Sequence, residues 1–396
     1  MNRVESLFAR SFLVLLSVLF TFTLIEVAAN IYLWNIAPEA TFNLFASINQ
    51  IKQRYGDDFF VNSDGKNGVL FVPHHYLGYT LTPNFEDGKN KHNSLGFRGD
   101  EISFEKPENT YRIVALGAST TYSVAVEDYH ESYPNLLGDY LTSNGYENVE
   151  VINAGVGGYT SYESLMNLEY RVLPLDPDLI IIYQGSNDIH TRFVYPYDKY
   201  LPDNSGYRAA FISDTVMPEI WEYSTVLRML SISLGITNSH SAIDWSRLRT
   251  SSYNYNSLFL RQYSISTYPS DIFTEISAMD MLENNPPIHF ERNTRNMVAM
   301  AQRQGVDVLL ITFATSTQFD LGNVGSPEYI FGHAQHNQVT QDVATSTGSY
   351  FYDMAEVFPD DETLFTDGRH MTVEGNQLRA KLIGDFIIES IFSTSQ

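Results

Sequence analysis

Residues 111–121 read YRIVALGASTT, a short apolar run that ends in glycine, alanine and serine. Four similar apolar runs follow, and stretches of ten or more residues with helical spacing separate them. This alternation is typical of βαβ units and predicts one doubly wound α/β domain with a parallel sheet. The five predicted strands are Arg112–Leu116, Val149–Asn153, Leu179–Tyr183, Val306–Thr312 and Tyr350–Tyr352.

The connections between these strands are of two kinds. Apolar residues recur at helical spacing from Tyr133 to Leu141, from Phe290 to Gln304 and from Thr372 to Phe392, and Thr372 is a suitable N-cap. Residues 189–288 have no strand pattern and are predicted to form an insertion. Two roles are open for this insertion: it could form a lid over the site, or it could add packing at one end of the sheet.

Composition excludes several classes of protein. The 396 residues include 24 Lys and Arg against 47 Asp and Glu, a formal net charge of −23, which argues against nucleic-acid binding. With 43% hydrophobic and 18% charged residues the chain has the composition of a packed globular protein. The absence of cysteine excludes disulfides, thiol nucleophiles and cysteine-ligated metals.

The N-terminal segment indicates a membrane anchor. Residues 12–25 are almost entirely apolar, and the apolar character resumes as far as Trp34. A helix of this length can cross a bilayer, and Arg3 and Arg10 before it predict a cytoplasmic N-terminus with the body of the protein outside. A cleaved signal peptide is the alternative, since Val27-Ala28-Ala29 resembles a cleavage site. Glu26 is costly within a span, and we expect it at the outer interface.

These observations divide the chain into three parts. Residues 1–35 are predicted to be a signal-anchor transmembrane helix, and residues 36–109 a juxtamembrane region with helix only around Thr41 to Arg54. Residues 110–396 are predicted to form the α/β domain with its insertion at 189–288.

Candidate catalytic residues come from both ends of the α/β domain. Ser119 follows the first predicted strand, at the sheet edge where doubly wound folds bind ligands. Asp367 and His370 precede the last helix. Because they are three positions apart, the carboxylate can orient the imidazole while the other ring nitrogen faces a serine.

Two further blocks supply hydrogen-bond donors for acyl transfer. A glycine-rich turn at residues 153–161 follows the second strand and can present a bare backbone N–H. The sequence Gln-Gly-Ser-Asn-Asp at residues 184–188 follows the third strand, and the Asn187 amide can donate as well. Such donors stabilise the oxyanion of a tetrahedral intermediate.

The four blocks together resemble the SGNH (GDSL-type) hydrolase family, from about Tyr111 to the C-terminus and excluding the insertion. The resemblance implies a three-layer α/β/α, flavodoxin-like sheet of about five strands. It implies a triad of Ser119, His370 and Asp367, an oxyanion hole formed by Ser119, Gly158 and Asn187, and no cofactor or metal. Ala118 replaces the usual aspartate of Gly-Asp-Ser, which predicts altered local hydrogen bonding around a retained nucleophile. Residues 93–98 also look like a stretch found in membrane-anchored bacterial members.

We therefore expect a membrane-anchored, extracytoplasmic serine esterase that removes O-acyl groups, chiefly acetyl, from cell-surface glycans or lipids. An O-acyltransferase acting on polysaccharide and a non-catalytic subunit of a membrane complex are the alternatives. The expected partners are the acylated substrate, the membrane and a membrane protein that contacts the anchor or residues 189–288, with no nucleic acid.

Other polar residues are not expected to act in catalysis. Adjacent His74 and His75 point to opposite sides in an extended segment, and His333 and His336 lack a third metal ligand. His130 is expected in the first turn of a helix. Arg98 and Arg369 are candidates for binding an anionic substrate, although Arg369 is expected to cover the helix start or pair with a local acid.

Overall fold

The computed structural model describes residues 3–55, 70–74, 77–201, 220–237, 239, 255–319 and 324–393. These residues form two compact units. Unit 1 comprises the described residues within Met1–Val61 and Phe211–Arg247, and unit 2 comprises those within Asn62–Ala210 and Leu248–Gln396. Residues 36–55 of the predicted juxtamembrane region therefore belong to unit 1, and residues 70–109 belong to unit 2. The insertion is likewise divided between the two units.

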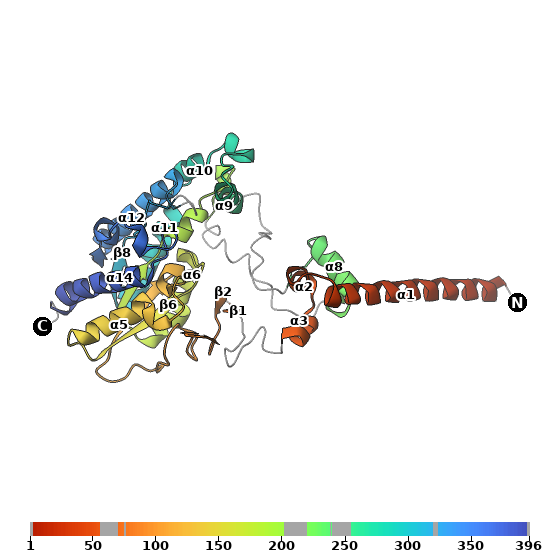
Figure 1. Cartoon of the computed structure of the whole chain (residues 1–396), viewed down its shortest axis with the longest axis horizontal. Helices are drawn as coiled ribbons and strands as arrows, with labels where there is room; N and C mark the ends of the chain where they lie inside the picture. The colour runs from red at the N-terminus through yellow and green to blue at the C-terminus, as the bar shows by residue number, and fades with distance from the viewer. Residues whose placement is uncertain are drawn as a thin grey trace. The chain divides into compact units, whose positions relative to one another are not determined.

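Unit 1 is built on one long helix. Its helices are α1 (Arg3–Asn35), α2 (Glu39–Phe45), α3 (Ile48–Tyr55) and α8 (Thr225–Ser233), and α8 lies against α1 (Figure 1). Within α1, residues Arg10–Asn35 are long and apolar enough to cross a membrane. A small core joins α1 to α2 and α3 through Leu33, Phe42, Ala46 and Ile51.

The helix predicted around Thr41 to Arg54 is two helices rather than one. The backbone is extended at Ala46. Ser47 then starts α3, because its hydroxyl accepts the N–H of Gln50 while the Gln50 side chain accepts the N–H of Ser47. This reciprocal capping defines the start of a new helix and explains the break.

Unit 2 contains a parallel sheet of five strands in the order β6-β5-β7-β8-β9. The strands are β5 (Tyr111–Gly117), β6 (Val149–Gly155), β7 (Leu179–Tyr183), β8 (Asp307–Ile311) and β9 (Tyr350–Tyr352). Numbered along the chain, the order is 2-1-3-4-5, which is that of flavodoxin-like sheets. All five strands coincide with the predicted ones to within two residues at each end.

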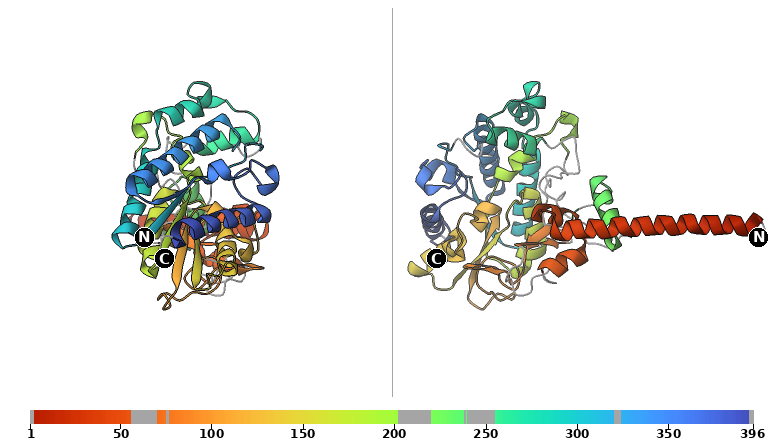
Figure 2. Two further views of the ribbon diagram at one scale, coloured as in Figure 1. Left: turned by 90° about the vertical axis from the view of Figure 1, so that its left-hand side faces the viewer. Right: turned by 45° about the vertical axis from the view of Figure 1, so that its right-hand side comes forward.

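Helices cover both faces of this sheet (Figure 2). On one face α6, α11 and α12 pack on alternate strand residues such as Val114, Leu116 and Ile180. On the other face α5 and α14 pack on the intervening residues, among them Ile113 and Ile181. Strands buried on both faces have continuous apolar sequences, as these do. The predicted three-layer, doubly wound fold is confirmed.

The helices of unit 2 connect and flank the strands. They are α4 (Ser119–Tyr122), α5 (Tyr133–Ser143), α6 (Ser161–Asn167), α7 (Ser186–His190), α9 (Asn256–Ser264), α10 (Ala278–Asn284), α11 (Ile288–Arg303), α12 (Pro327–Thr347), α13 (Met354–Val357) and α14 (Val373–Phe386). The Thr372 hydroxyl accepts the N–H of Gly375 and caps α14, as predicted, and a π-helical turn extends α14 to Phe392.

Two smaller features complete unit 2. Two antiparallel hairpins precede the sheet: β1 (Phe71–His74) with β2 (Gly78–Leu81), and β3 (Glu86–Asp87) with β4 (Asn90–Lys91). The described insertion residues of unit 2 form a satellite core in which α9 and α10 pack against α12 around Phe259, Met281 and Tyr329. This part of the insertion contributes packing around α12.

Candidate active site

The carboxyl ends of β5, β6 and β7 lie side by side. Gly117 at the end of β5 is in register with Gly155 of β6 and with Tyr183 of β7. Ser119, Gly158 and Asn187 follow these three strand ends after two, three and four residues, respectively. The parallel sheet therefore carries the serine, glycine and asparagine blocks to one edge.

Two glycines let the helix that begins at Ser119 sit close to this edge. A Cβ on Gly117 would lie 2.3 Å from Thr121 Oγ1 and from the Tyr183 carbonyl oxygen, and a Cβ on Gly155 would lie 2.2 Å from the Tyr122 nitrogen. Neither space admits a side chain. These glycines therefore permit α4 to pack directly on the strand ends, with the partly exposed Ser119 at its first position.

Ser119, His370 and Asp367 form a continuous hydrogen-bonded series. Ser119 Oγ lies 2.8 Å from His370 Nε2, and His370 Nδ1 lies 2.7 Å from Asp367 Oδ2. The other carboxylate oxygen of Asp367 accepts the backbone N–H groups of Arg369 and His370, at 3.1 and 2.9 Å. The arrangement is that of a nucleophile, a base and an orienting acid.

The environment keeps Asp367 ionised. Burial raises the pKa of its carboxyl group, but the hydrogen bonds and charge of His370, together with the charge of Arg369, outweigh burial and hold the pKa well below its usual range. An ionised carboxylate accepts a hydrogen bond from Nδ1–H and so favours the tautomer whose unprotonated Nε2 faces the serine.

A tight turn positions Asp367 and His370. Gly368 has φ +85°, and a Cβ there would lie 2.8 Å from the carbonyl oxygen of Ser316. The backbone N–H of Ser316 donates to the Gly368 carbonyl at 2.8 Å, and Asp360 accepts the Ser316 hydroxyl at 2.6 Å. The loop after β8 thus supports the turn that carries the imidazole. The Asp-x-x-His spacing in the sequence did not indicate that the loop after β8 would support this turn.

The predicted oxyanion donors lie on the two neighbouring turns. Gly158 has φ +85°, and its backbone N–H, like that of Ser119, donates to no other residue in the described parts of the chain. The Asn187 amide donates one hydrogen to the Tyr159 carbonyl at 2.8 Å, which fixes the side chain and leaves its second hydrogen for another acceptor.

Asp188 connects the asparagine and glycine blocks. Its buried carboxylate accepts the backbone N–H and the hydroxyl of Ser161, the first residue of α6. Burial raises the pKa of this carboxyl group to about 7, against the opposing effect of the Ser161 hydrogen bonds. No separate role was predicted for Asp188 from the sequence. Its place directly after Asn187 was the available signal.

Ala118 occupies the position of the usual aspartate. Its side chain is buried in an apolar cluster that includes Leu77, Tyr79, Tyr122 and Val156. Ala118 therefore packs against strand β2 where the aspartate of Gly-Asp-Ser would place a polar group. This difference agrees with the predicted change in local hydrogen bonding.

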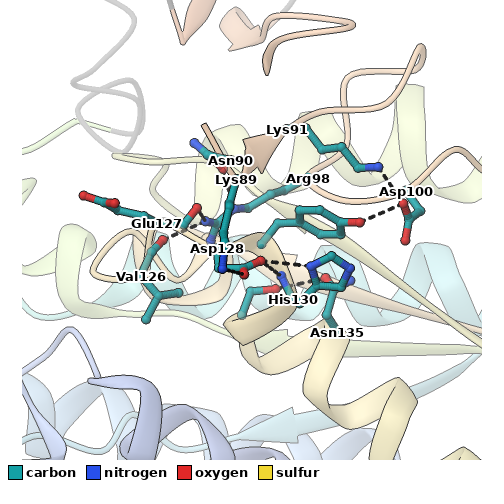
Figure 3. A network of polar contacts seen from close by, with 12 residues as sticks. Lys89, Asn90, Lys91, Arg98, Asp100, Val126, Glu127, Asp128, His130 and Asn135 are labelled. Atoms are coloured by element: carbon teal, nitrogen blue, oxygen red, sulfur yellow. Dashed lines mark hydrogen bonds and ion pairs between the residues drawn. The ribbon is translucent and has the colours of Figure 1, made fainter. Parts of the chain in front are cut away.

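Arg98 has a structural role, which corrects the suggestion that it binds substrate. Its buried guanidinium donates to the carbonyl oxygens of Tyr122 and Ser123 at 2.5 and 3.0 Å. It also donates to the carbonyl oxygen of Val126 at 2.7 Å (Figure 3). These bonds hold the segment after α4, where Ser123 has a left-handed backbone with φ +64°. No donor of Arg98 points to the serine, and the residue secures the helix that carries it.

Of the other histidines considered in the sequence analysis, those that the structure describes make contacts outside the triad. His130 is in a short 3-10 turn, where its Nδ1 lies 2.9 Å from Asp128 Oδ1 (Figure 3). His333 and His336 are both on α12, and His336 Nδ1 bonds the Gly185 carbonyl at 2.8 Å. His74 Nδ1 accepts the N–H of Leu77, and His75 lies outside the described residues. Among those residues, no three side chains are grouped to share a metal ion.

Several buried polar atoms near the strand ends have no hydrogen-bond partner among the described residues. They are both amide atoms of Gln184, Ser186 Oγ and Arg369 Nε. Arg369 Nε lies 3.6 Å from Asp367 Oδ2, so the prediction that Arg369 pairs with a local acid is met only by a long ion pair. Gln184 and Ser186 flank Gly185, just before Asn187.

Part of the sequence matches the model of a known protein family. Residues 115–210 match the model of the GDSL-like lipase/acylhydrolase family. The matched segment includes the serine, glycine and asparagine blocks and ends before Asp367 and His370. No curated protein matches the sequence.

Solved structures with a similar fold include an acetyl xylan esterase, AlAXEase, with 17% identity and a TM-score of 0.40 over 70% of this chain and 99% of the other. A lipase/acylhydrolase from Enterococcus faecalis has 17% identity and a TM-score of 0.39 over 70% and 95% of the two chains. A GDSL-like lipase from Bacteroides thetaiotaomicron has 16% identity and a TM-score of 0.38 over 72% and 92%.

The match over residues 115–210 confirms the resemblance expected from the serine, glycine and asparagine blocks. It indicates a hydrolase of ester bonds that is similar to GDSL-like lipases and acylhydrolases.

Proposed function

We propose that this protein is a membrane-anchored, extracytoplasmic serine esterase that removes O-acyl groups, with acetyl as the expected group, from cell-surface glycans or lipids. The observation that carries the proposal is the hydrogen-bonded series from Ser119 Oγ through His370 to Asp367, at 2.8 and 2.7 Å. A non-catalytic protein would not require a serine, a histidine and an aspartate in this geometry.

In the first half of the proposed reaction, His370 Nε2 takes the proton of Ser119 as Oγ attacks the ester carbonyl. Asp367 stabilises the imidazolium that forms. The backbone N–H groups of Ser119 and Gly158 and the amide of Asn187 are the proposed donors to the oxyanion. The imidazolium then protonates the departing alcohol oxygen, which leaves an acyl group on Ser119.

In the second half, His370 removes a proton from water, and the hydroxide attacks the acyl carbonyl. The tetrahedral intermediate collapses as His370 returns the proton to Ser119 Oγ, and the carboxylic acid is released. If the hydroxyl group of a second sugar replaces the water, the same steps give transacylation.

The contacts of α1 support retention of this helix as an anchor. Glu26 and Asn30 of α1 bond Thr225, and Glu26 also bonds Ser224, the N-cap of α8. Cleavage after Ala29 would remove Glu26 and leave the Ser224 hydroxyl and the Thr225 N–H without this acceptor. The length and apolar character of Arg10–Asn35 support a membrane span, and Arg3 and Arg10 favour a cytoplasmic N-terminus.

The test uses the full chain in detergent or nanodiscs, a fluorophosphonate probe and p-nitrophenyl acetate. We expect labelling and turnover by the unmodified protein, loss of both in Ser119→Ala, and retention of both in Ser143→Ala, which removes an exposed serine on α5. Absence of labelling in the unmodified protein would contradict the esterase and favour a non-catalytic subunit. Incubation with acetylated glycan as donor and bare glycan as acceptor separates hydrolysis, which releases acetate, from transfer.

A further inference from the structure

The surface of α8 is reversed relative to an ordinary surface helix. Tyr223, just before the helix, and Leu227, Leu230 and Leu234 are exposed by 75, 37, 53 and 72%. The spacing of three and four residues places Leu227, Leu230 and Leu234 on one helix face, and Tyr223 lies before the extended N-cap Ser224. Ile220 and Ile236 extend the exposed apolar surface at the two ends. We call these six residues the α8 stripe.

Three of the four polar residues of α8 face inward, together with Ile232. The Arg228 side chain is fully buried, donates to the Ala46 carbonyl at 2.9 Å and pairs with Glu222. Ser231 and Thr225 are also buried. A helix in water has the opposite arrangement, with its apolar face on the core and its charges outside. The pattern of α8 is therefore that of a helix whose outer face meets an apolar medium.

The position of α8 on α1 indicates which medium this is. The Glu26 carboxylate accepts the Ser224 hydroxyl at 2.7 Å and the N–H groups of Thr225 and Val226 at 2.5 and 3.0 Å. A carboxylate at the N-terminus of a helix satisfies donors that have no partner within the helix. The first turn of α8 is thus fixed at the level of Glu26, inside the segment Arg10–Asn35.

The exposed apolar surface of α1 continues to this level and beyond it. Ile25, Val27, Ile31 and Ile36 are exposed by 50, 51, 52 and 68%. Glu26 lies 16 residues after Arg10, or about 24 Å along the helix axis, against a hydrocarbon thickness of about 30 Å. Glu26 therefore belongs to the outer part of a span that begins near Arg10. The α8 stripe adjoins a surface that faces lipid if α1 is a membrane anchor.

We infer that α8 is an interfacial membrane helix that lies in the outer leaflet beside the anchor, with the α8 stripe in the acyl chains. The inference rests on the proposed membrane anchor. At nine residues, or about 13 Å, α8 is too short to cross the bilayer. It gives unit 1 a second lipid contact that restricts rotation about the axis of α1, and it accounts for a carboxylate within the apolar segment.

The absence of cysteine allows a direct test. The full chain is placed at one copy per nanodisc, and single cysteines at Leu230 and Leu234 are labelled with an environment-sensitive fluorophore. Quenching is measured with lipids brominated in the acyl chains and with aqueous iodide. Leu19→Cys in α1 reports the anchor, Ser143→Cys in α5 reports water, and Ser233→Cys is the control on the exposed flank of α8.

We expect a blue-shifted emission at positions 230 and 234, with loss of intensity in brominated lipid as at position 19 and little loss with iodide. Position 233 should lose less intensity in brominated lipid than its neighbours, and position 143 should respond to iodide alone. Iodide quenching at 230 and 234 with lipid quenching at 19 would overturn the inference and leave the anchor intact.

Two other results are also decisive. Protection of positions 230 and 234 from both quenchers would mean that protein covers the α8 stripe, and it would overturn a lipid contact. Iodide quenching at position 19 would remove the anchor and the inference together. Equal lipid quenching at 230, 233 and 234 would contradict a helix with one lipid-facing side.

Discussion

The backbone N–H of Ser161 donates to both carboxylate oxygens of Asp188, at 3.0 Å from each. The Ser161 hydroxyl donates to the same carboxylate. The contact joins the first turn of α6 to α7, the helix that carries Asn187. Both residues are buried, so a charge on this carboxylate is costly.

The stability of the protein should therefore fall between about pH 4 and pH 7. The unfolded chain releases the Asp188 proton near pH 3.8, whereas the folded chain retains it up to about pH 7. Over this interval the folded state binds the extra proton, and its stability decreases as the pH rises. Asp188→Asn should flatten this part of the profile, measured by thermal unfolding at several pH values. An unchanged slope in Asp188→Asn, with Asp139→Asn as the exposed control, would contradict the assignment.

Asp367→Asn should lower kcat by about 10⁴-fold, because an amide in place of the carboxylate favours the wrong tautomer of the imidazole. Circular dichroism should show no change in fold. Asp139→Asn, which alters an exposed aspartate on α5, should keep full activity. Normal turnover by Asp367→Asn would exclude Asp367 from the reaction.

Asn187→Ala should lower kcat by about 10²–10³-fold with a smaller change in KM, as expected for the loss of a donor that acts mainly in the transition state. The measurement is steady-state hydrolysis of p-nitrophenyl acetate. A rise in KM at constant kcat would instead mean that Asn187 binds the substrate and does not stabilise the oxyanion.

Gly368→Ala should reduce both stability and turnover. A left-handed backbone costs a residue with a Cβ about 1–2 kcal/mol, and here the Cβ also meets the Ser316 carbonyl oxygen at 2.8 Å. The turn must shift, and His370 shifts with it. Gly348→Ala is the matched control, because Gly348 also has positive φ but no atom within 4 Å of the added Cβ. Gly348→Ala should reduce stability without reducing turnover. Equal turnover by Gly368→Ala and Gly348→Ala would contradict the role of the turn.

Arg98→Lys should destabilise the protein by on the order of 3 kcal/mol, because an ammonium group cannot reproduce the forked contacts with three carbonyl oxygens. The midpoint of thermal unfolding measures this loss. Relative turnover of neutral and anionic esters should stay the same in the folded variant. A selective loss of activity on anionic esters would restore Arg98 as a substrate-binding residue.

The sequence predicted the central sheet well because its strands are buried on both faces. Runs such as Leu179–Tyr183 are continuously apolar and end in glycine-containing turns, so both type and extent of the strand are visible. The three blocks at strand ends were then expected together, since parallel strands place their carboxyl ends at one edge. The family match supports the blocks up to residue 210.

Features that depend on distant contacts were not predictable. The long helix α12 has no apolar stripe, because its buried positions include His333, His336 and Thr340, and only Ser326 and Pro327 marked its start. The break at Ala46 depended on the exchange of bonds between Ser47 and Gln50. Arg98 was taken for a possible substrate ligand because its sequence does not indicate that its partners are backbone carbonyls 24 or more residues away.

The separation of 251 positions between Ser119 and His370 has a consequence for biosynthesis. The hydroxyl emerges from the ribosome long before the imidazole does, and the two meet only after β8 and β9 have joined the sheet. During synthesis the nascent polypeptide therefore has a serine without its base, and it should not react with cellular esters. A fragment that ends before position 370 should stay inert until the missing piece is supplied as a separate polypeptide.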